Sequence, residues 1–167
     1  MSDASNIIIR EANKNDIEII QQLAHKIWPS AYGKILSADQ LKYMIEVFYS
    51  ESSLQKQFEE GHFLVVEENK QPIAFADYSL LKDAIYKLNK IYALPSEQGK
   101  GIGKLLMNDV IKRVKQNGAT ALRLNVNRSN KAKQFYEHLG FKIISEEDID
   151  IGEGYFMNDY IMEKLIS

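Results

Sequence analysis

The apolar residues of this chain recur at two spacings, one typical of strands and the other typical of amphipathic helices. Short runs rich in β-branched and aromatic residues predict seven strands, at residues 7–10, 62–67, 73–81, 85–94, 121–126, 142–150 and 155–164. A polar turn at residues 68–71 joins two of these strands into a hairpin. Strands joined by a hairpin pair antiparallel, so the middle of the chain is expected to form an antiparallel sheet.

Helical spacing dominates between the first two strands. It predicts a first helix that Asn15 or Asp16 caps. Pro29 is expected to end that helix, because the residue before a proline disfavours the helical conformation. Two further helices are expected to begin at Ser37 and at Ser52 or Ser53, and the last of them to end at Gly61.

A long amphipathic helix follows a glycine-rich turn near residue 100, and a shorter helix is expected at residues 131–139. The predicted apolar stripe of the long helix consists of Ile102, Leu105, Leu106, Val110, Ile111 and Val114. Strand–helix–strand passages in this half of the chain require a partly parallel sheet with helices packed on it. The sequence therefore predicts one mixed α/β domain over residues 1–167.

Composition excludes several classes of function. The chain has 167 residues, 45% of them hydrophobic, and a formal net charge of −2 at pH 7. A dedicated nucleic-acid-binding protein needs clustered basic residues to neutralise phosphates, so nucleic acid is not an expected partner. The absence of cysteine excludes disulfides, thiolate zinc sites and a cysteine nucleophile. His25, His62 and His138 are too dispersed for a metal-binding spacing, so no metal site is expected.

The compartment is predicted from the same features. Residues 1–6 are polar and lack the apolar run of a signal peptide. No stretch approaches the ~18–20 apolar residues that cross a bilayer, so no membrane association is expected. Together with the absence of cysteine, this predicts a cytoplasmic protein.

A glycine-rich turn, Gln98-Gly99-Lys100-Gly101-Ile102-Gly103, separates a strand from the long helix. Glycine lets the backbone approach a ligand, and successive N–H groups at a helix N-terminus bind anions with the help of the helix dipole. Lys100 and Lys104 add positive charge. The turn therefore predicts a phosphate or pyrophosphate site. It matches neither the G-x-G-x-x-G dinucleotide fingerprint nor the Gly-Lys-Ser/Thr of a P-loop.

Two motifs in this half of the chain resemble the GNAT superfamily of acyl-CoA-dependent N-acetyltransferases. The first is Gln98, Gly101 and Gly103 in the pattern Q/R-x-x-G-x-G/A. The second consists of Asn130, Ala132, Phe135, Tyr136, Gly140 and Phe141. Its spacing leaves Asn127 and Ser129 open as alternatives to Asn130. Two further segments look like the bacterial polyamine acetyltransferases of this superfamily, one with Trp28, Tyr32, Gln40, Tyr43 and Met44 and the other at residues 150–160.

The resemblance implies the GNAT fold, a mixed and mostly antiparallel sheet with a splayed parallel pair of strands, flanked by helices. It implies acetyl-CoA as co-substrate, held at the pantetheine arm by the backbone of Ile91, Tyr92 and Ala93. Tyr136 is expected to donate a proton to the departing thiolate; a core aromatic is the alternative role. A homodimer is a further implication. The remaining residues expected to contact the cofactor are Gly99, Lys100, Gly101, Ile102, Gly103, Lys104, Asn130, Lys133 and Phe135.

The proton acceptor is left open by the sequence. Some family members carry a glutamate where this chain has Asn125, and asparagine cannot accept a proton at neutral pH. Ordered water, Glu46 and Asp77 are the alternatives, although both carboxylates are expected to be solvated surface charges. The side chains expected to contact the acceptor substrate are those of Tyr32, Gln40 and Tyr43.

The sequence therefore predicts an enzyme that transfers an acetyl group from acetyl-CoA to a small primary amine by direct attack. A polyamine is the first choice of acceptor. One alternative is an acetyltransferase for protein N-termini or lysines. Another is a non-catalytic acyl-CoA sensor, which would keep the glycine-rich turn without depending on Tyr136.

Overall fold

The computed structural model describes residues 6–167, so the expectation for the polar N-terminal segment falls largely on residues outside that range. Its contacts group the chain into two compact units. The first contains the residues up to Ser79 together with Lys90–Val110, and the second contains Leu80–Asn89 together with Ile111–Ser167. Strands β3 and β4 and helix α4 contribute residues to both units.

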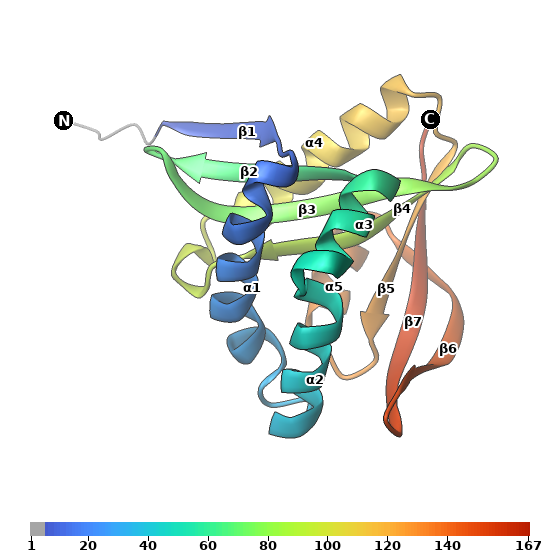
Figure 1. Cartoon of the computed structure of the whole chain (residues 1–167). Helices are drawn as coiled ribbons and strands as arrows, with labels where there is room; N and C mark the ends of the chain where they lie inside the picture. The colour runs from blue at the N-terminus through green and yellow to red at the C-terminus, as the bar shows by residue number, and fades with distance from the viewer. Residues whose placement is uncertain (1–5) are drawn as a thin grey trace. The chain divides into compact units, whose positions relative to one another are not determined.

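Seven strands form one sheet in the order β1-β2-β3-β4-β5-β7-β6 (Figure 1). All seven predicted strands are present, with ends shifted by at most two residues. They are β1 Ile7–Glu11, β2 His62–Glu68, β3 Gln71–Lys82, β4 Ile85–Ala93, β5 Ala121–Asn127, β6 Lys142–Gly152 and β7 Tyr155–Leu165.

One strand pair is parallel. Strand β4 pairs with β5 from Ile85 opposite Ala121 to Leu88 opposite Leu124. The registered pairing ends there, and β5 continues to Asn127 with β7 as its antiparallel partner. The pairs β1–β2, β2–β3, β5–β7 and β6–β7 are antiparallel. The predicted mixed, mostly antiparallel sheet with a parallel pair that separates is confirmed.

Three helices pack on the strands of the first unit. They are α1 Ile17–Tyr32, α2 Ala38–Tyr49 and α3 Glu51–Glu60. The Tyr49 ring meets the Phe75 ring edge-on with centroids 6.1 Å apart, which places α2 against β3. In β3, residues 73–78 are buried without alternation, so both faces of the strand are covered. The fully buried large side chains of this unit are those of Ile20, Tyr49, Leu54, Phe63, Leu64, Phe75, Leu106 and Met107.

The second unit contains the β5–β7–β6 part of the sheet, helix α5 Ala132–His138 and the last part of α4 Ile102–Gln116. Gly140, with φ +95°, follows α5 and turns the chain toward β6. The fully buried large side chains of this unit are those of Leu122, Leu124, Phe141 and Met162.

The expected end of α1 at Pro29 is wrong. The helix continues to Tyr32, and the N–H of Gly33 still donates to the Pro29 carbonyl at 2.9 Å. A proline inside a helix removes one hydrogen bond. Packing across the proline offsets that loss, because the rings of Trp28 and Tyr32 lie 4.8 Å apart and Trp28 is buried.

The predicted cap of α3 is also wrong, whereas the cap of α2 is confirmed. Ser37 caps α2 and accepts a hydrogen bond from the N–H of Gln40. Helix α3 begins after Ser50, whose hydroxyl accepts a hydrogen bond from the N–H of Ser53 at 3.2 Å. Ser52 and Ser53 therefore lie within the helix that they were expected to open.

The buried stripe of α4 differs from the predicted one at Leu105 and at Ile111, which is only half-buried. Leu105 was expected to be buried, but 43% of its surface is exposed, and Met107 is fully buried instead. Ile102, Leu106 and Val110 recur every four residues and define the buried line. With 3.6 residues per turn, a line through every fourth residue drifts around the helix toward the side of Met107 and away from that of Leu105.

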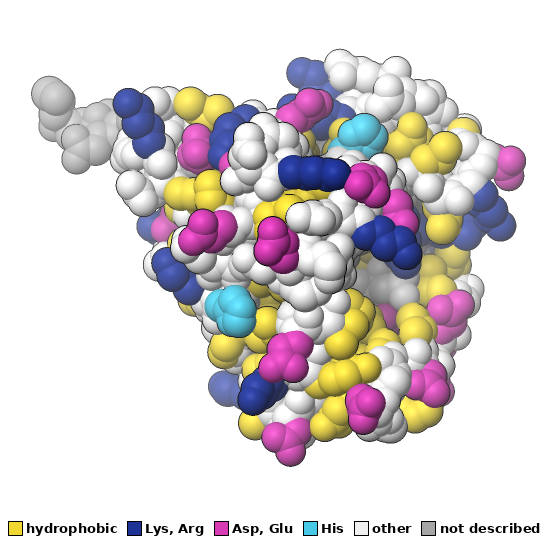
Figure 2. Space-filling view, viewed as in Figure 1, with side chains coloured by type: hydrophobic (Ala, Val, Ile, Leu, Met, Phe, Trp, Pro, Cys, Tyr) yellow, Lys and Arg dark blue, Asp and Glu magenta, His cyan; other side chains and the backbone are white. Residues whose placement is uncertain are grey.

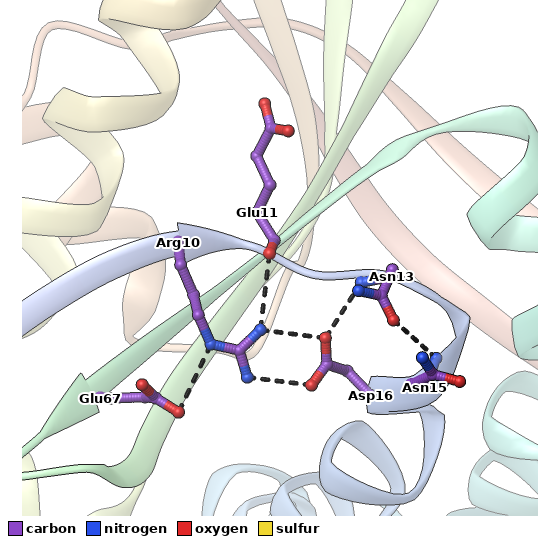
Figure 3. A network of polar contacts seen from close by, with 6 residues as sticks. All are labelled: Arg10, Glu11, Asn13, Asn15, Asp16 and Glu67. Carbon is purple, nitrogen blue, oxygen red and sulfur yellow. Dashed lines mark hydrogen bonds and ion pairs between the residues drawn. The ribbon is translucent and has the colours of Figure 1, made fainter.

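A partly buried ion pair between Arg10 and Asp16 anchors β1 to the start of α1 (Figure 3). Both terminal nitrogens of Arg10 donate to the Asp16 carboxylate, at 2.9 and 3.0 Å, and Glu67 lies 3.4 Å from the Arg10 Nε. Asp16 stands at the predicted N-cap of α1, but it makes no capping hydrogen bond to that helix. Its carboxylate accepts instead from the N–H of Asn13, which completes the capping box of the short helical turn Lys14–Asp16.

Replacing Asp16 with alanine is expected to lower the free energy of unfolding at pH 7 by about 1–3 kcal/mol, since a bidentate charge-assisted pair is lost. Arg10 lowers the pKa of Asp16. The contribution of this pair is therefore present at neutral pH and disappears as the pH falls below the ordinary aspartate pKa, about 3.9. Urea denaturation across this range measures the difference.

Lys14→Ala is the control for Asp16→Ala, because the pair between Lys14 and Glu59 is largely exposed. The control is expected to leave the free energy of unfolding nearly unchanged, because solvent screens an exposed ion pair. Equal losses for the two variants would show that the Arg10–Asp16 pair contributes no more than a surface pair.

Candidate functional site

The glycine-rich turn lies in the first unit and leads directly into α4. Gly99 and Gly101 adopt φ angles of +79° and +80°, a region that L side chains rarely occupy. The carbonyl of Gly101 accepts the N–H of Leu105 at 2.9 Å, so the helical hydrogen bonds begin at this glycine. The first N–H groups of a helix have no partner within it, and they point toward the turn. This is the geometry of an anion cradle.

Neighbouring side chains fix the approach to this turn. Gln98 donates from its amide to the Ala93 carbonyl at 3.3 Å, which ties the turn to the end of β4. The buried carboxylate of Glu97 lies 3.6 Å from the Nζ of Lys100. Lys104 is exposed on the first turn of α4. Both predicted lysines therefore lie beside the predicted anion cradle.

The end of β4 carries an aromatic cluster, made of Trp28, Tyr32, Tyr49, Phe75 and Tyr92. The Tyr92 ring lies 5.6–6.3 Å from the rings of Phe75, Trp28 and Tyr32. The hydroxyl groups of Tyr32 and Tyr92 are hydrogen bonded at 2.8 Å. This hydrogen bond connects Tyr32, which is predicted to contact the acceptor substrate, with Tyr92, which is predicted to contact the cofactor.

The other two residues predicted to contact the acceptor lie on α2. Gln40 is half-buried and its amide faces the sulfur of Met44 at 3.8 Å. Tyr43 is half-buried as well. Their contact with a substrate, like that of Tyr32, stays a prediction.

Asp77 is buried, so the expectation of a solvated surface charge is wrong for this residue, although it holds for the exposed Glu46. Asp77 lies opposite Phe63 in β3, a strand covered on both faces. Its Oδ1 would lie 2.6 Å from a side-chain carbon at position 61, so Gly61 leaves room for the carboxylate. Burial is the main cause that raises the pKa of Tyr49, and Asp77 adds to it.

The second predicted motif begins at the turn between β5 and α5. The side chain of Asn130 accepts the N–H of Ala132 at 2.9 Å, and its own N–H donates to the Asn127 carbonyl. The Asn127 side chain accepts the N–H of Ser129 at 2.9 Å. Both asparagines therefore shape the entry to α5. A role of Asn130 at the cofactor stays a prediction.

Tyr136 is buried in α5 at 9% exposure. Its ring lies 5.4 Å from the Phe135 ring and 6.0 Å from the Phe141 ring. Its carbonyl accepts the N–H of Phe141 at 3.0 Å, which closes the end of the helix. These ring contacts are enough to explain why an aromatic residue occupies position 136. The role of Tyr136 as an acid stays a prediction. Lys133, also predicted at the cofactor, lies 3.8 Å from Glu137 and faces the Tyr160 ring.

A buried carboxylate that the sequence analysis missed lies on β7. Asp159 is 2% exposed and accepts a hydrogen bond from the Asn125 amide at 3.3 Å. The pKa of Asp159 is raised, mainly by burial; the charges of Lys87 and Arg128 oppose this rise and that of Glu147 adds to it. The signal in the sequence is weak, because β7 also contains Asn158, Glu163 and Lys164 and nothing in the order of residues marks Asp159 as the buried one.

Carboxylates gather on the β6–β7 hairpin, where Figure 2 shows acidic side chains over the lower right of the molecule. Arg128 neutralises part of this charge through ion pairs with Glu146 and Asp148. Glu147 and Asp150 are exposed on the same strand. This surface therefore favours cations.

Within residues 6–167, no three His, Asp or Glu side chains are grouped as metal ligands. No described helix is both long enough and apolar enough to span a membrane.

Comparison with known families gives one match that runs through both units. The sequence model of a family described as "Acetyltransferase (GNAT) domain" matches residues 34–156. The match includes the glycine-rich turn, Asn125, Asn130 and Tyr136. It ends before Asp159.

Two curated relatives and one solved structure extend the comparison. "[Ribosomal protein bS18]-alanine N-acetyltransferase" of Haemophilus influenzae is 38% identical over 89 residues, 53% of this chain and 57% of that protein. "Spermidine N(1)-acetyltransferase" of Thermoplasma acidophilum is 28% identical over 95% of this chain and 97% of that protein. The PaiA N-acetyltransferase from T. acidophilum, solved in complex with coenzyme A, has a TM-score of 0.82 at 28% identity and 99% coverage of both chains.

Replacing Asp159 with asparagine is expected to raise the free energy of unfolding at neutral pH, because a buried charge without a cationic partner is removed. With its pKa raised, Asp159 binds more protons in the folded state than in the unfolded state. The wild-type protein should therefore lose stability as the pH rises from the ordinary aspartate pKa, about 3.9, through the raised one. The variant should lack this decline. Denaturant unfolding over this range checks both points, and a destabilised variant would contradict them.

Proposed function

The chain belongs to the GNAT family of acetyltransferases and uses acetyl-CoA as acetyl donor, and we propose that its acceptor is a polyamine. The observation that carries the choice of acceptor is the similarity to a spermidine acetyltransferase over nearly the whole length of both chains. The acidic β6–β7 hairpin supports it, because a polyamine is a multiple cation at neutral pH. The reaction is expected in the cytoplasm, and the homodimer stays a prediction.

The proposed reaction needs a bound pyrophosphate, a reachable thioester, a neutral amine and a proton for the leaving thiolate. The N–H groups at the start of α4, with Lys100 and Lys104, supply the charge for the pyrophosphate. The backbone of Ile91–Ala93 would hold the pantetheine arm. Asn130, Lys133 and Phe135 would contact the cofactor from the start of α5. Tyr136 would protonate the thiolate of coenzyme A.

A protein N-terminus is the second candidate acceptor. It is favoured by the higher identity to a ribosomal-protein alanine acetyltransferase, although that similarity covers about half of each chain. A polyamine and a peptide differ in what they require. A multiple cation gains from clustered carboxylates, whereas a neutral peptide depends on backbone hydrogen bonds.

A panel of acceptors is expected to separate these candidates. Release of free thiol from acetyl-CoA is measured with spermidine, spermine, and peptides with an N-terminal alanine. We expect turnover with the polyamines and little with the peptides. The reverse result would favour the second candidate. Tight binding of acetyl-CoA without turnover of any amine would favour the non-catalytic sensor.

Replacing Tyr136 with phenylalanine is expected to lower kcat by ~10²-fold or more, because general acid catalysis contributes that much. The affinity for coenzyme A in calorimetry should not change, since the ring that packs on Phe135 and Phe141 is kept. Tyr86→Phe, the same change on β4, serves as control and should retain activity. An unchanged kcat in the Tyr136 variant would leave this residue with a packing role alone.

Gly101→Ala and Gly118→Ala test the anion cradle as a matched pair. Both glycines have a positive φ, +80° and +83°, and a Cβ at either position would meet nothing within 4 Å. Both variants should therefore lose a similar ~1–2 kcal/mol of stability from backbone strain. Only Gly101→Ala should weaken the binding of coenzyme A, by about tenfold or more, because it displaces the N–H groups of the cradle. Equal affinities in calorimetry would argue against the cradle.

A further inference from the structure

Four acidic side chains of the described residues are buried, and they differ in what compensates their charge. They are Asp16, Asp77, Glu97 and Asp159. Asp16 has the bidentate Arg10, and Glu97 has Lys100 and the Ser96 hydroxyl at 3.3 Å. The charge of Asp77 acts on the buried Tyr49 and helps to raise the pKa of that hydroxyl.

Asp159 is compensated least among those whose contacts are established. Its described side-chain hydrogen bond comes from Asn125, a neutral amide, at 3.3 Å. Arg128 donates a hydrogen bond to the backbone carbonyl of Asp159, not to its carboxylate. The ion pairs of Arg128 are formed with Glu146 and Asp148. Within residues 6–167, no lysine, arginine or histidine forms an ion pair with the Asp159 carboxylate. Burial of a carboxylate without a cation lowers the stability of the folded protein. Such a residue is therefore a candidate for a role in function.

The position of Asp159 in the sheet indicates that role. It lies opposite Asn127, the last residue of β5, and on the same face as Asn125. Parallel pairing of β5 with β4 ends at Leu124, one residue before Asn125. The turn that follows Asn127 leads into α5, which packs on β5 and carries Tyr136. The carboxylate thus lies where β5 leaves its parallel partner and next to the motif that carries the proposed acid.

We propose that Asp159 is the proton acceptor of the reaction and contacts the ammonium of the acceptor, while Asn125 fixes the carboxylate through its amide. The inference rests on the proposed function, because it assigns a step within amine acetylation. The ammonium is the cation that the buried carboxylate lacks, and their attraction is strengthened by the low dielectric around them.

The charged groups that face Asp159 set the pH at which it can accept a proton. Burial raises its pKa, the Asn125 hydrogen bond lowers it, Lys87 on β4 and Arg128 after β5 lower it, and Glu147 on β6 raises it. The net direction is upward. A carboxylate of raised pKa is a stronger base, and it stays ionised only above that pKa. Activity is therefore expected to fall on the acidic side as Asp159 becomes protonated.

The acceptor ammonium gives one proton to the Asp159 carboxylate, and its nitrogen lone pair forms the N–C bond to the thioester carbonyl. The C–S bond breaks, and both of its electrons leave on sulfur. The thiolate takes a proton from Tyr136, and the resulting phenolate removes the second proton from the acylated nitrogen. Asp159 then releases its proton to water, so the products are the amide, free coenzyme A and one proton.

The test compares wild type, Asp159→Asn and the control Asp83→Asn, a like change in an exposed turn where φ is +50°. The pH dependence of kcat and KM is measured with spermidine, from mildly acidic to alkaline conditions. In the Asp159 variant, kcat is expected to fall by ~10²–10⁴-fold and the acidic limb to disappear. Coenzyme A affinity should hold, and Asp83→Asn should behave as wild type.

A second acceptor distinguishes a base from a structural residue. With 2,2,2-trifluoroethylamine, a weakly basic amine that is neutral at the assay pH, the defect of Asp159→Asn should shrink at least tenfold, because no proton needs to be removed before attack. The double change Asn125→Asp with Asp159→Asn restores one carboxylate and one amide with their positions exchanged. It should recover much of the lost activity with spermidine, and it decides the question if the single variant does not fold.

The outcomes separate this inference from the function on which it rests. Absence of turnover by the wild-type enzyme with every amine would overturn the proposed function, and the role of Asp159 with it. A normal kcat in Asp159→Asn would overturn the inference alone. Equal losses for spermidine and the weakly basic amine, or a folded but inactive double variant, would also overturn it.

Discussion

Parallel pairing of β4 with β5 is the constraint on which the rest of the molecule depends. Two parallel strands cannot be joined by a tight turn, so the chain must cross over between them. Here the crossover consists of the glycine-rich turn and α4. The same requirement therefore creates a helix N-terminus directly after the carboxyl end of a strand, where exposed N–H groups collect and anions bind. The position of the predicted phosphate-binding turn thus follows from the topology, and the positive φ angles of Gly99 and Gly101 shape its backbone.

The protein buries carboxylates in two different ways. Asp16 is held by a guanidinium and by a backbone N–H, and its burial stabilises the joint between β1 and α1. Asp159 has a neutral amide in place of a cation. In the first case the energy of the interaction is used within the folded chain. In the second it is available to a ligand, because a cation that enters the site completes the compensation.

The sequence predicted the strands well because their periodicity is local. Seven strands and the helix after Ser37 lie within two residues of their expected bounds. Tertiary packing decided the rest. Aromatic contacts carried α1 past Pro29, and the coverage of both faces of β3 buried Asp77. The motifs placed the turn before α4, but the partnership of Asn125 with Asp159 joins residues 34 positions apart and becomes visible only when β5 and β7 pair.

Strand β6 forms an edge of the sheet, and its sequence determines how that edge behaves between molecules. An exposed edge can pair with another copy of itself and start aggregation. If two β6 strands paired antiparallel about Glu147, Glu146 of one would face Asp148 of the other, and the two Glu147 side chains would face each other. Like charges directly opposite are destabilising. The acidic edge therefore disfavours pairing between two β6 strands near neutral pH, and this effect weakens in acid as the carboxylates become neutral.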